Sequence, residues 1–334
     1  MTSTAPIPII RDIAPPTRLS TTGLVLAVAS ALAFSSSGPF IKPLLEAGWS
    51  VGAALIVRIG LAGLLLSPAL FVAMRRQRSF LRRHGLLMVG FGVTAVVGCQ
   101  LFYFLAMQRM PVAVALLIQF LAPVMLVLLA WVRTKRAPST LVIVGSVVAV
   151  AGLVLVVDIS GVSFDFVGTL FALCAAVCVM AYYLIAEKSR DDLPPLALAA
   201  GGLLAGALFM GVLVVIGVLP FHAPPVSVEL AGIEVPWFVP LLWVACVATT
   251  LGYGLGVMAI PRIGSRVGSF VGLSEVLFAL GFAWLLLAEV PAPVQFVGGA
   301  LILVGVVLVR LDASAGTGRR GRAGKAISPA VPAP

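Results

Sequence analysis

Two charged residues lie well away from the ends of long apolar runs in this 334-residue chain. Glu275 is near the middle of one run, where a carboxylate costs roughly 2.5 kcal/mol or more unless it faces a cavity or a partner. It could bind a substrate amine or carry a coupling proton; the alternative is a hydrogen bond between helices. Arg58 could bind a substrate carboxylate through two parallel hydrogen bonds. It could equally extend its guanidinium to the outer lipid headgroups.

Other polar side chains share these runs and are further candidates for contact with a substrate. Lys42 lies nearer a run's end, where extension to the headgroups is the favoured interpretation. Glu289 precedes a proline at a run's end, which favours an interface or helix-start role. The uncharged candidates for lining a central cavity are Ser36, Gln100, Tyr103, Gln119 and Tyr253. For each of these alone, a hydrogen bond between helices is an equally good explanation.

The residues needed for several other kinds of chemistry are missing. The two histidines, His84 and His222, lie between apolar runs, and no spacing of His, Cys, Asp or Glu is typical of a metal site. The four cysteines all fall within apolar runs, which favours buried thiols over disulfides. No glycine-rich loop ending in Lys-Ser or Lys-Thr is present to bind ATP. We therefore expect neither an enzyme nor a bound cofactor or metal.

The elements that must position these residues are membrane-spanning helices. Hydrophobic residues make up 61% of the chain and charged residues 10%, and the apolar runs are each long enough to cross a bilayer as a helix. A transmembrane barrel would instead show short segments that alternate apolar and polar residues. The sequence predicts an all-α integral membrane protein with ten transmembrane helices. The predicted spans are residues 22–44, 51–73, 85–107, 112–132, 139–157, 166–186, 196–219, 236–259, 265–288 and 291–310.

The positive charges predict how these spans are oriented. With the N-terminus inside, all but three of the 22 lysines and arginines fall on the inner side; the exceptions are Lys42, Arg58 and Arg109. Cytoplasmic loops carry such an excess. This distribution of positive charge requires an even number of spans, so both termini are expected in the cytoplasm. The expected location of the chain is the cell membrane. It also explains the net charge of +10 without nucleic acid as a partner.

The chain contains an internal repeat. Ala106–Val156 aligns with Ala259–Val309 without a gap, and the matches include arginine, tryptophan, proline and glycine pairs. The predicted organisation is a cytoplasmic tail (1–21), a first five-helix repeat (22–157), a second (166–310) and a disordered cytoplasmic tail (311–334). Because five spans is an odd number, the second repeat must be inverted relative to the first. Inverted repeats are typical of secondary transporters that work by alternating access.

Several motifs resemble EamA-type drug/metabolite transporters. Leu101–Ala106 followed by Ala113–Val124 resembles the third and fourth spans of that family, and Ser274–Val276 with Trp284–Glu289 resembles the ninth and tenth. Ser36–Gly38 with Lys42 is similar to bacterial threonine/homoserine exporters. Two positions depart from the family pattern, because Arg136 and Val276 stand where it has a glutamate and a proline.

This resemblance implies the class of substrate. The implied function is secondary-active export of amino acids or similar small metabolites through the lipid bilayer, with a proton as the candidate coupling ion. A drug or toxic-compound efflux carrier of the same fold is the alternative, and a channel or a membrane enzyme is less favoured, since no charged ring or pore loop is evident. The sequence leaves a homodimer open.

Overall fold

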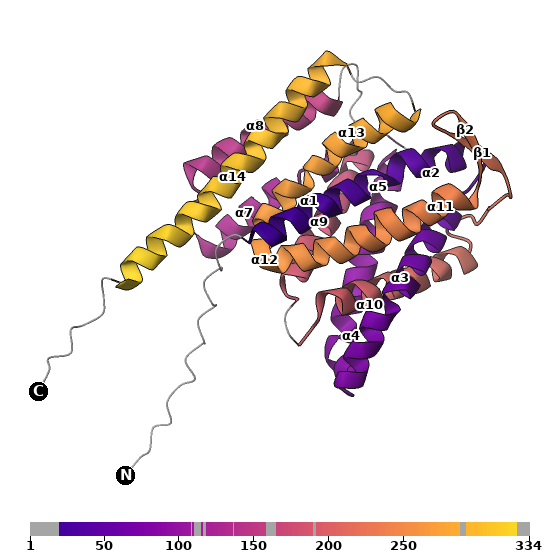
Figure 1. The fold of residues 1–334 in the computed structure, drawn as a ribbon, viewed down its shortest axis with the longest axis horizontal. Helices are drawn as coiled ribbons and strands as arrows, with labels where there is room; N and C mark the ends of the chain where they lie inside the picture. Colours follow the sequence, from indigo (N-terminus) through magenta and orange to yellow (C-terminus); the bar gives the residue numbers. More distant parts are fainter. Residues whose placement is uncertain are drawn as a thin grey trace, which may run out of the picture.

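The computed structural model describes residues 20–107, 109, 115, 118–135, 137–157, 165–189, 192–287 and 292–325. These residues form a helical bundle with one short antiparallel hairpin at its edge (Figure 1). The helices are α1 (Thr21–Ser35), α2 (Ser37–Glu46), α3 (Val51–Arg76), α4 (Phe80–Gly90), α5 (Cys99–Met107), α7 (Ala122–Thr134), α8 (Thr140–Val157), α9 (Phe166–Glu187), α10 (Pro195–Val215), α11 (Phe238–Trp243), α12 (Gly252–Gly272), α13 (Ser274–Leu287) and α14 (Pro293–Lys325). Two π-helical segments are η1 (Phe91–Gly98) and η2 (Val244–Leu251), and the hairpin strands are β1 (Ser227–Leu230) and β2 (Ile233–Pro236).

The apolar runs form the predicted kind of element. Among the described residues, 6 helical segments are long and apolar enough to cross a membrane. They are Thr21–Glu46, Val51–Arg76, Phe80–Tyr103, Phe166–Glu187, Pro195–Val215 and Phe238–Gly272. The shorter apolar helices are Ala122–Thr134, Thr140–Leu155, Ser274–Leu286 and Pro293–Val309. The all-α membrane fold class is therefore confirmed, whereas the number of spans stays a prediction.

Two of the long segments contain a π-helical stretch. η1 joins α4 to α5, and η2 joins α11 to α12. Within η2 the Thr249 hydroxyl donates to the Val244 carbonyl at 2.8 Å, five residues back along the chain. Extended towards the N-terminus without a gap, the alignment of the two repeats places η1 on η2. Such wide turns commonly occur at functional sites, and here they occupy equivalent positions in both copies.

The predicted ninth span, residues 265–288, is not one continuous helix. α12 continues through residues 260–264, which were expected to separate the eighth and ninth spans. It has a kink at Gly264, whose φ of 80° and ψ of 155° suit only glycine. α12 then ends, and α13 begins after Leu273. Glu275 consequently lies in the first turn of α13. Its predicted position in the middle of an unbroken helix is wrong, because a uniformly apolar run gives no sign of where its helix is interrupted.

The C-terminal helix is longer than the predicted tenth span. α14 continues beyond residue 310 to Lys325, so the first part of the expected disordered tail, 311–334, is helical. No proline stops the helix, since the next one after Pro293 is Pro329. The predictions for most of the N-terminal tail, for much of the first half of span 112–132, and for Arg136 and Glu289 fall outside the described residues.

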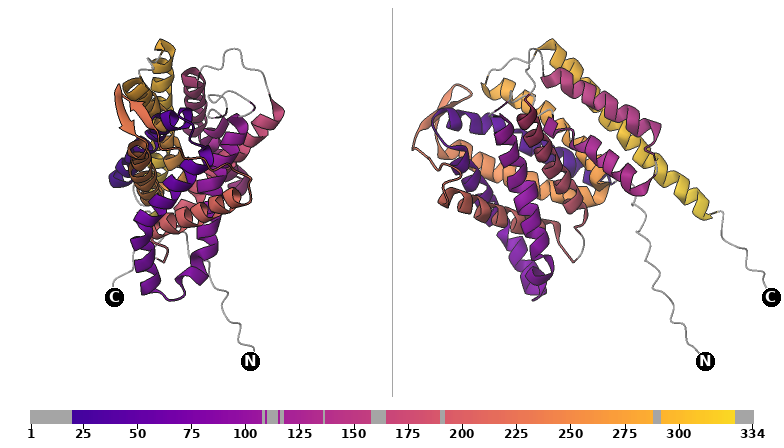
Figure 2. Two further views of the ribbon diagram at one scale, coloured as in Figure 1. Left: turned by 90° about the vertical axis from the view of Figure 1, so that its right-hand side faces the viewer. Right: turned by 180° about the vertical axis from the view of Figure 1, so that it is seen from behind.

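α8 and α14 pack side by side along one flank of the molecule (Figures 1 and 2). Glycines let their backbones approach closely: a Cβ at Gly152 would lie 2.5 Å from the Gly298 carbonyl oxygen, and one at Gly145 would lie 2.9 Å from that of Gly305. The two helices therefore run antiparallel. In the repeat alignment Gly145 matches Gly298 and Gly152 matches Gly305, so exchanging the copies converts one contact into the other. Small residues at a helix interface are typical of membrane proteins.

Segments that are expected on the same side of the membrane contact each other. Arg83 pairs with Asp192 at 3.3 Å, and both were expected inside. On the expected outer side the Ser50 hydroxyl donates to the Pro220 carbonyl at 3.0 Å, and the Trp49 indole donates to the Pro224 carbonyl at 2.9 Å. The segment around the β1–β2 hairpin is thereby fixed to the corner between α2 and α3.

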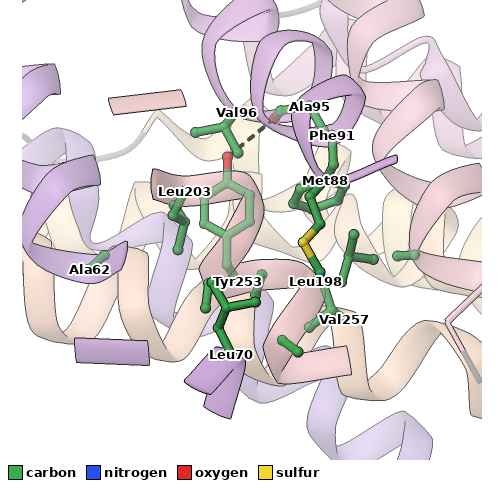
Figure 3. Packing of buried hydrophobic residues seen from close by; sticks show 14 of the residues in the cluster. Ala62, Leu70, Met88, Phe91, Ala95, Val96, Leu198, Leu203, Tyr253 and Val257 are labelled. Atoms are coloured by element: carbon green, nitrogen blue, oxygen red, sulfur yellow. Dashed lines mark hydrogen bonds between the residues drawn. The ribbon is translucent and has the colours of Figure 1, made fainter. Parts of the chain in front are cut away.

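The largest buried core lies where α3, α4, η1, α10 and α12 meet (Figure 3). Phe91 and Leu203 are among its fully buried side chains. Within this core the Tyr253 hydroxyl donates to the Ala95 carbonyl at 3.2 Å, which joins α12 to η1 (Figure 3). The core thus fixes the ring of Tyr253, one wall of the cavity described next.

Candidate substrate-binding cavity

A cavity of about 120 Å³ lies between helices from both parts of the chain. The elements around it are α1, η1, α5, α9, α12 and α13, together with Gln119. The lining residues are Ala27, Ser30, Ala31, Phe34, Ala95, Cys99, Gln100, Gln119, Val179, Tyr182, Tyr183, Tyr253, Gly256, Ala259, Ile260, Gly268, Gly272 and Glu275. Small side chains on α1 and α12 leave the space open, and larger polar ones project into it.

Four aromatic rings form one side of the cavity. Phe34 meets Tyr253 edge to face with ring centroids 4.9 Å apart, and Tyr182 meets Tyr183 in the same way at 5.0 Å. Tyr182 also meets Tyr253 at 5.9 Å, so the rings of α1, α9 and α12 form a continuous chain. Edge-to-face contacts of this kind hold aromatic rings in fixed orientations.

Two glycines of α12 make room for the tyrosine hydroxyls of α9. The Tyr182 hydroxyl occupies the space that a Cβ at Gly256 would fill, and the Tyr183 hydroxyl does the same at Gly272. Next to Gly256 the Ser30 hydroxyl donates to the Gly252 carbonyl at 2.7 Å, which holds α1 against α12. The positions of both tyrosines therefore depend on the absence of a side chain on the facing helix.

Glu275 supplies the charged group of the described lining. Its carboxylate lies near the N-terminus of α13, where the helix dipole favours a negative charge. Among the described residues none donates a hydrogen bond to it and none forms an ion pair with it. A carboxylate left in this way beside a cavity is available to a bound molecule.

The cavity holds another polar group that has no partner among the described residues. The Gln119 Oε1 atom is buried and has no hydrogen bond to any residue that the structure describes. Because buried polar atoms are nearly always hydrogen-bonded, such an atom facing a cavity indicates a place for a ligand or a water molecule. Gln119 and Glu275 thus both favour a polar occupant.

Arg58 is buried but is not part of the cavity lining. It is 7% exposed; its Nε donates to the Thr249 hydroxyl at 3.1 Å and its Nη1 to the Ser37 hydroxyl at 2.9 Å. Extension of this side chain to the headgroups, one of the two predicted alternatives, is therefore wrong. The guanidinium instead joins α3 to α2 and η2 within the protein.

The structure brings together half of the residues chosen from the sequence. Gln100, Gln119, Tyr253 and Glu275 line the cavity. The other four candidates lie elsewhere. Ser36 accepts a hydrogen bond from the Trp243 indole, and Tyr103 packs against the cluster of Ala106, Ala115 and Ala172. Lys42 is exposed on α2, and Arg58 is held by Ser37 and Thr249. The roles of all eight residues stay predictions.

Sequence reasoning did not select Ser30, Phe34 or Cys99, which also line the cavity. A serine or a phenylalanine in an apolar run is common in membrane helices, so nothing distinguished these positions. Tyr182 and Tyr183 were noticeable as adjacent tyrosines in one span. Their pairing with Gly256 and Gly272 is visible only in the structure, because it joins distant parts of the chain.

A multi-pass helical bundle with a small polar cavity between its helices is the arrangement of a membrane transporter. The chain belongs to the EamA-like transporter family, whose model matches it twice, over residues 21–158 and 166–311. The predicted resemblance to EamA-type transporters is therefore confirmed. The two matched segments leave the chain ends and residues 159–165 outside the family model.

Two similar proteins are amino-acid exporters by name. The threonine/homoserine exporter RhtA of Escherichia coli strain K12 is 28% identical over 290 residues, covering 84% of this chain and 87% of its own. A probable terminal-alkyne amino-acid exporter of Streptantibioticus cattleyicolor is 27% identical over 288 residues, covering 86% and 91%. A solved structure described as "Crystal structure of protein" shares the fold, with a TM-score of 0.63, 20% identity and coverage of 87% of this chain and 95% of its own.

Proposed function

We propose that this chain is a secondary-active exporter of amino acids or similar small metabolites that works by alternating access. The observation that carries the proposal is the cavity between the helices, in which the Glu275 carboxylate has no partner among the described residues. An ammonium group is the natural partner for such a carboxylate. The names of the relatives point to the same class of substrate.

The size of the cavity favours small metabolites over the alternative of drug efflux. Its volume is about 120 Å³. Sites for drug-sized ligands measure roughly 300–1,000 Å³. In this conformation a molecule the size of a small amino acid is the better match, and a larger compound would require the helices to separate.

An inverted arrangement of ten spans supports alternating access. The long and the shorter apolar helices of the described residues are compatible with this arrangement. The α8–α14 contact maps onto itself when the repeats are exchanged, and η1 and η2 occupy equivalent positions. If the two repeats are equivalent but inverted, each set of contacts that closes the cavity on one side of the membrane has a counterpart on the other side. When the two repeats exchange their conformations, the cavity opens to the opposite side.

The proposed cycle uses Arg58 as part of the outer closure. Its bonds to Ser37 and Thr249 join three segments on the expected outer side of the cavity. Phe34 and Tyr253 form a second contact between α1 and α12. Opening outwards would separate these groups. Opening inwards would separate the start of α1 from the middle of α12, where Gly23 faces Ile263 beside the Gly264 kink.

We predict that Glu275→Gln abolishes transport while the protein still inserts into the membrane. The change keeps the size of the side chain but removes the charge that an ammonium group requires. Efflux of threonine and homoserine from proteoliposomes is the measurement, with coupling tested by imposing and collapsing a proton gradient. Glu234→Gln, at an exposed position of β2, is the control and should transport normally. Undiminished efflux by Glu275→Gln would refute the role assigned to this carboxylate.

A further inference from the structure

The charge of the described cavity lining is one-sided. Glu275 is its acidic residue, and the described lining contains no lysine, arginine or histidine. We propose that the protein recognises its substrate through the ammonium group alone, so that it also exports small primary amines that carry no carboxylate. This inference rests on the proposed function, because it concerns the same cavity.

The nearest candidate to bind a substrate carboxylate is already engaged. The Arg58 guanidinium has hydrogen bonds to Thr249 and Ser37 and lies behind the lining. The Thr249 hydroxyl is itself fixed, because it donates to the Val244 carbonyl. At 7% exposure the side chain offers little surface to a substrate carboxylate. Lys42, the other predicted cation, is exposed on α2.

The rest of the lining suits a cation or a neutral group. The rings of Phe34, Tyr182, Tyr183 and Tyr253 present aromatic surface, which attracts a cation through its π-electrons. The tyrosine hydroxyls and the amides of Gln100 and Gln119 can each donate or accept. They would serve the hydroxyl of an amino alcohol as well as the carboxylate of an amino acid.

Three small molecules of nearly equal size test the proposal on the wild-type protein. Threonine has both charges, threoninol keeps the ammonium group but has a hydroxyl in place of the carboxylate, and 3-hydroxybutyrate keeps only the carboxylate. Efflux of each is measured from preloaded proteoliposomes. A site built to bind the carboxylate would reject threoninol by roughly 10⁴-fold, whereas we expect threoninol and threonine to differ by less than about tenfold. We expect no efflux of 3-hydroxybutyrate above that from empty liposomes.

Two variants separate the roles of the charges. Arg58→Met should lower the efflux of threonine and threoninol in the same proportion, because the guanidinium acts in closure and not in recognition. Arg109→Met, at an exposed position expected outside, is the matched control. Glu275→Gln should abolish both activities.

The outcomes are distinguishable. The inference is overturned if the wild-type protein exports threonine but rejects threoninol, or if Arg58→Met loses threonine and keeps threoninol. If Arg58→Met does not fold, the wild-type comparison alone decides. Failure of the wild-type protein to move either molecule contradicts the proposed function as well, whereas export of threoninol alone supports the inference and contradicts only the amino-acid substrate.

Discussion

At the scale of single residues, Gly256 determines where the Tyr182 hydroxyl can lie. We predict that Gly256→Ala displaces this hydroxyl and lowers substrate affinity by about tenfold or more, since overpacking a tight site costs roughly 1–3 kcal/mol. Threonine binding to purified protein is the measurement. Gly254→Ala is the control on the same helix, because a Cβ there would meet its nearest neighbour, Leu196, at an ordinary 3.5 Å. Equal affinity in both variants would contradict the role of Gly256.

The cavity residues found from the sequence share a physical reason. Glu275, Gln100 and Gln119 are costly in hydrocarbon, so a position within an apolar run already indicated a cavity or a partner. The same reasoning chose Arg58, whose partners are the hydroxyls of neighbouring segments rather than the cavity. The free-energy cost of a polar side chain in hydrocarbon indicates that the side chain has a partner. Only the three-dimensional arrangement shows which group that partner is.

At the scale of helices, the α8–α14 contact depends on glycine backbones lying against each other. A Cβ at Gly152 would lie 2.5 Å from the Gly298 carbonyl oxygen and 2.7 Å from the Ile302 nitrogen. We predict that Gly152→Ala lowers the free energy of unfolding in detergent by about 1–3 kcal/mol, because α8 and α14 must separate. Thermal unfolding followed by circular dichroism measures this.

Gly281→Ala on α13 is the control for that change, because a Cβ there meets nothing within 4 Å. It should leave stability unchanged or raise it slightly, since alanine favours helix by up to about 1 kcal/mol relative to glycine. A Gly152→Ala protein as stable as the Gly281→Ala protein would show that α8 and α14 do not need this close approach.

The helices themselves could be predicted, but their irregularities could not. Apolar length fixes where a helix must cross the bilayer. The π-helical segments η1 and η2 and the interruption at Leu273 change only which backbone atoms bond to each other, and the surrounding residues stay apolar. No difference in hydropathy marks them. The Gly264 kink had a visible signal in its glycine, but a positive φ is one of several reasons for glycine in a helix.

At the scale of the whole molecule, the start of α1 and the end of α14 lie towards one side, and the β1–β2 hairpin lies at the opposite side (Figure 1). We predict that both termini are cytoplasmic, since this places nearly all lysines and arginines inside. A reporter fused after Pro334 should be active in its cytoplasmic form, and the same reporter inserted after Gly232 in the hairpin should be active only outside. The reverse pattern would overturn the orientation.

The hydrogen bonds of Arg58 affect the relative populations of the inward-open and outward-open conformations. In the proposed cycle, outward opening separates the guanidinium from Ser37 and Thr249. Each hydrogen bond to a charged group is worth about 1.5–3 kcal/mol. Losing both without replacement makes the outward-open form rarer by a factor of at least about 100. Without substrate, the protein is then mostly closed or open to the cytoplasm, which is the side from which an exporter binds its substrate. The binding free energy of the substrate must offset the loss of the two hydrogen bonds when the protein opens outwards.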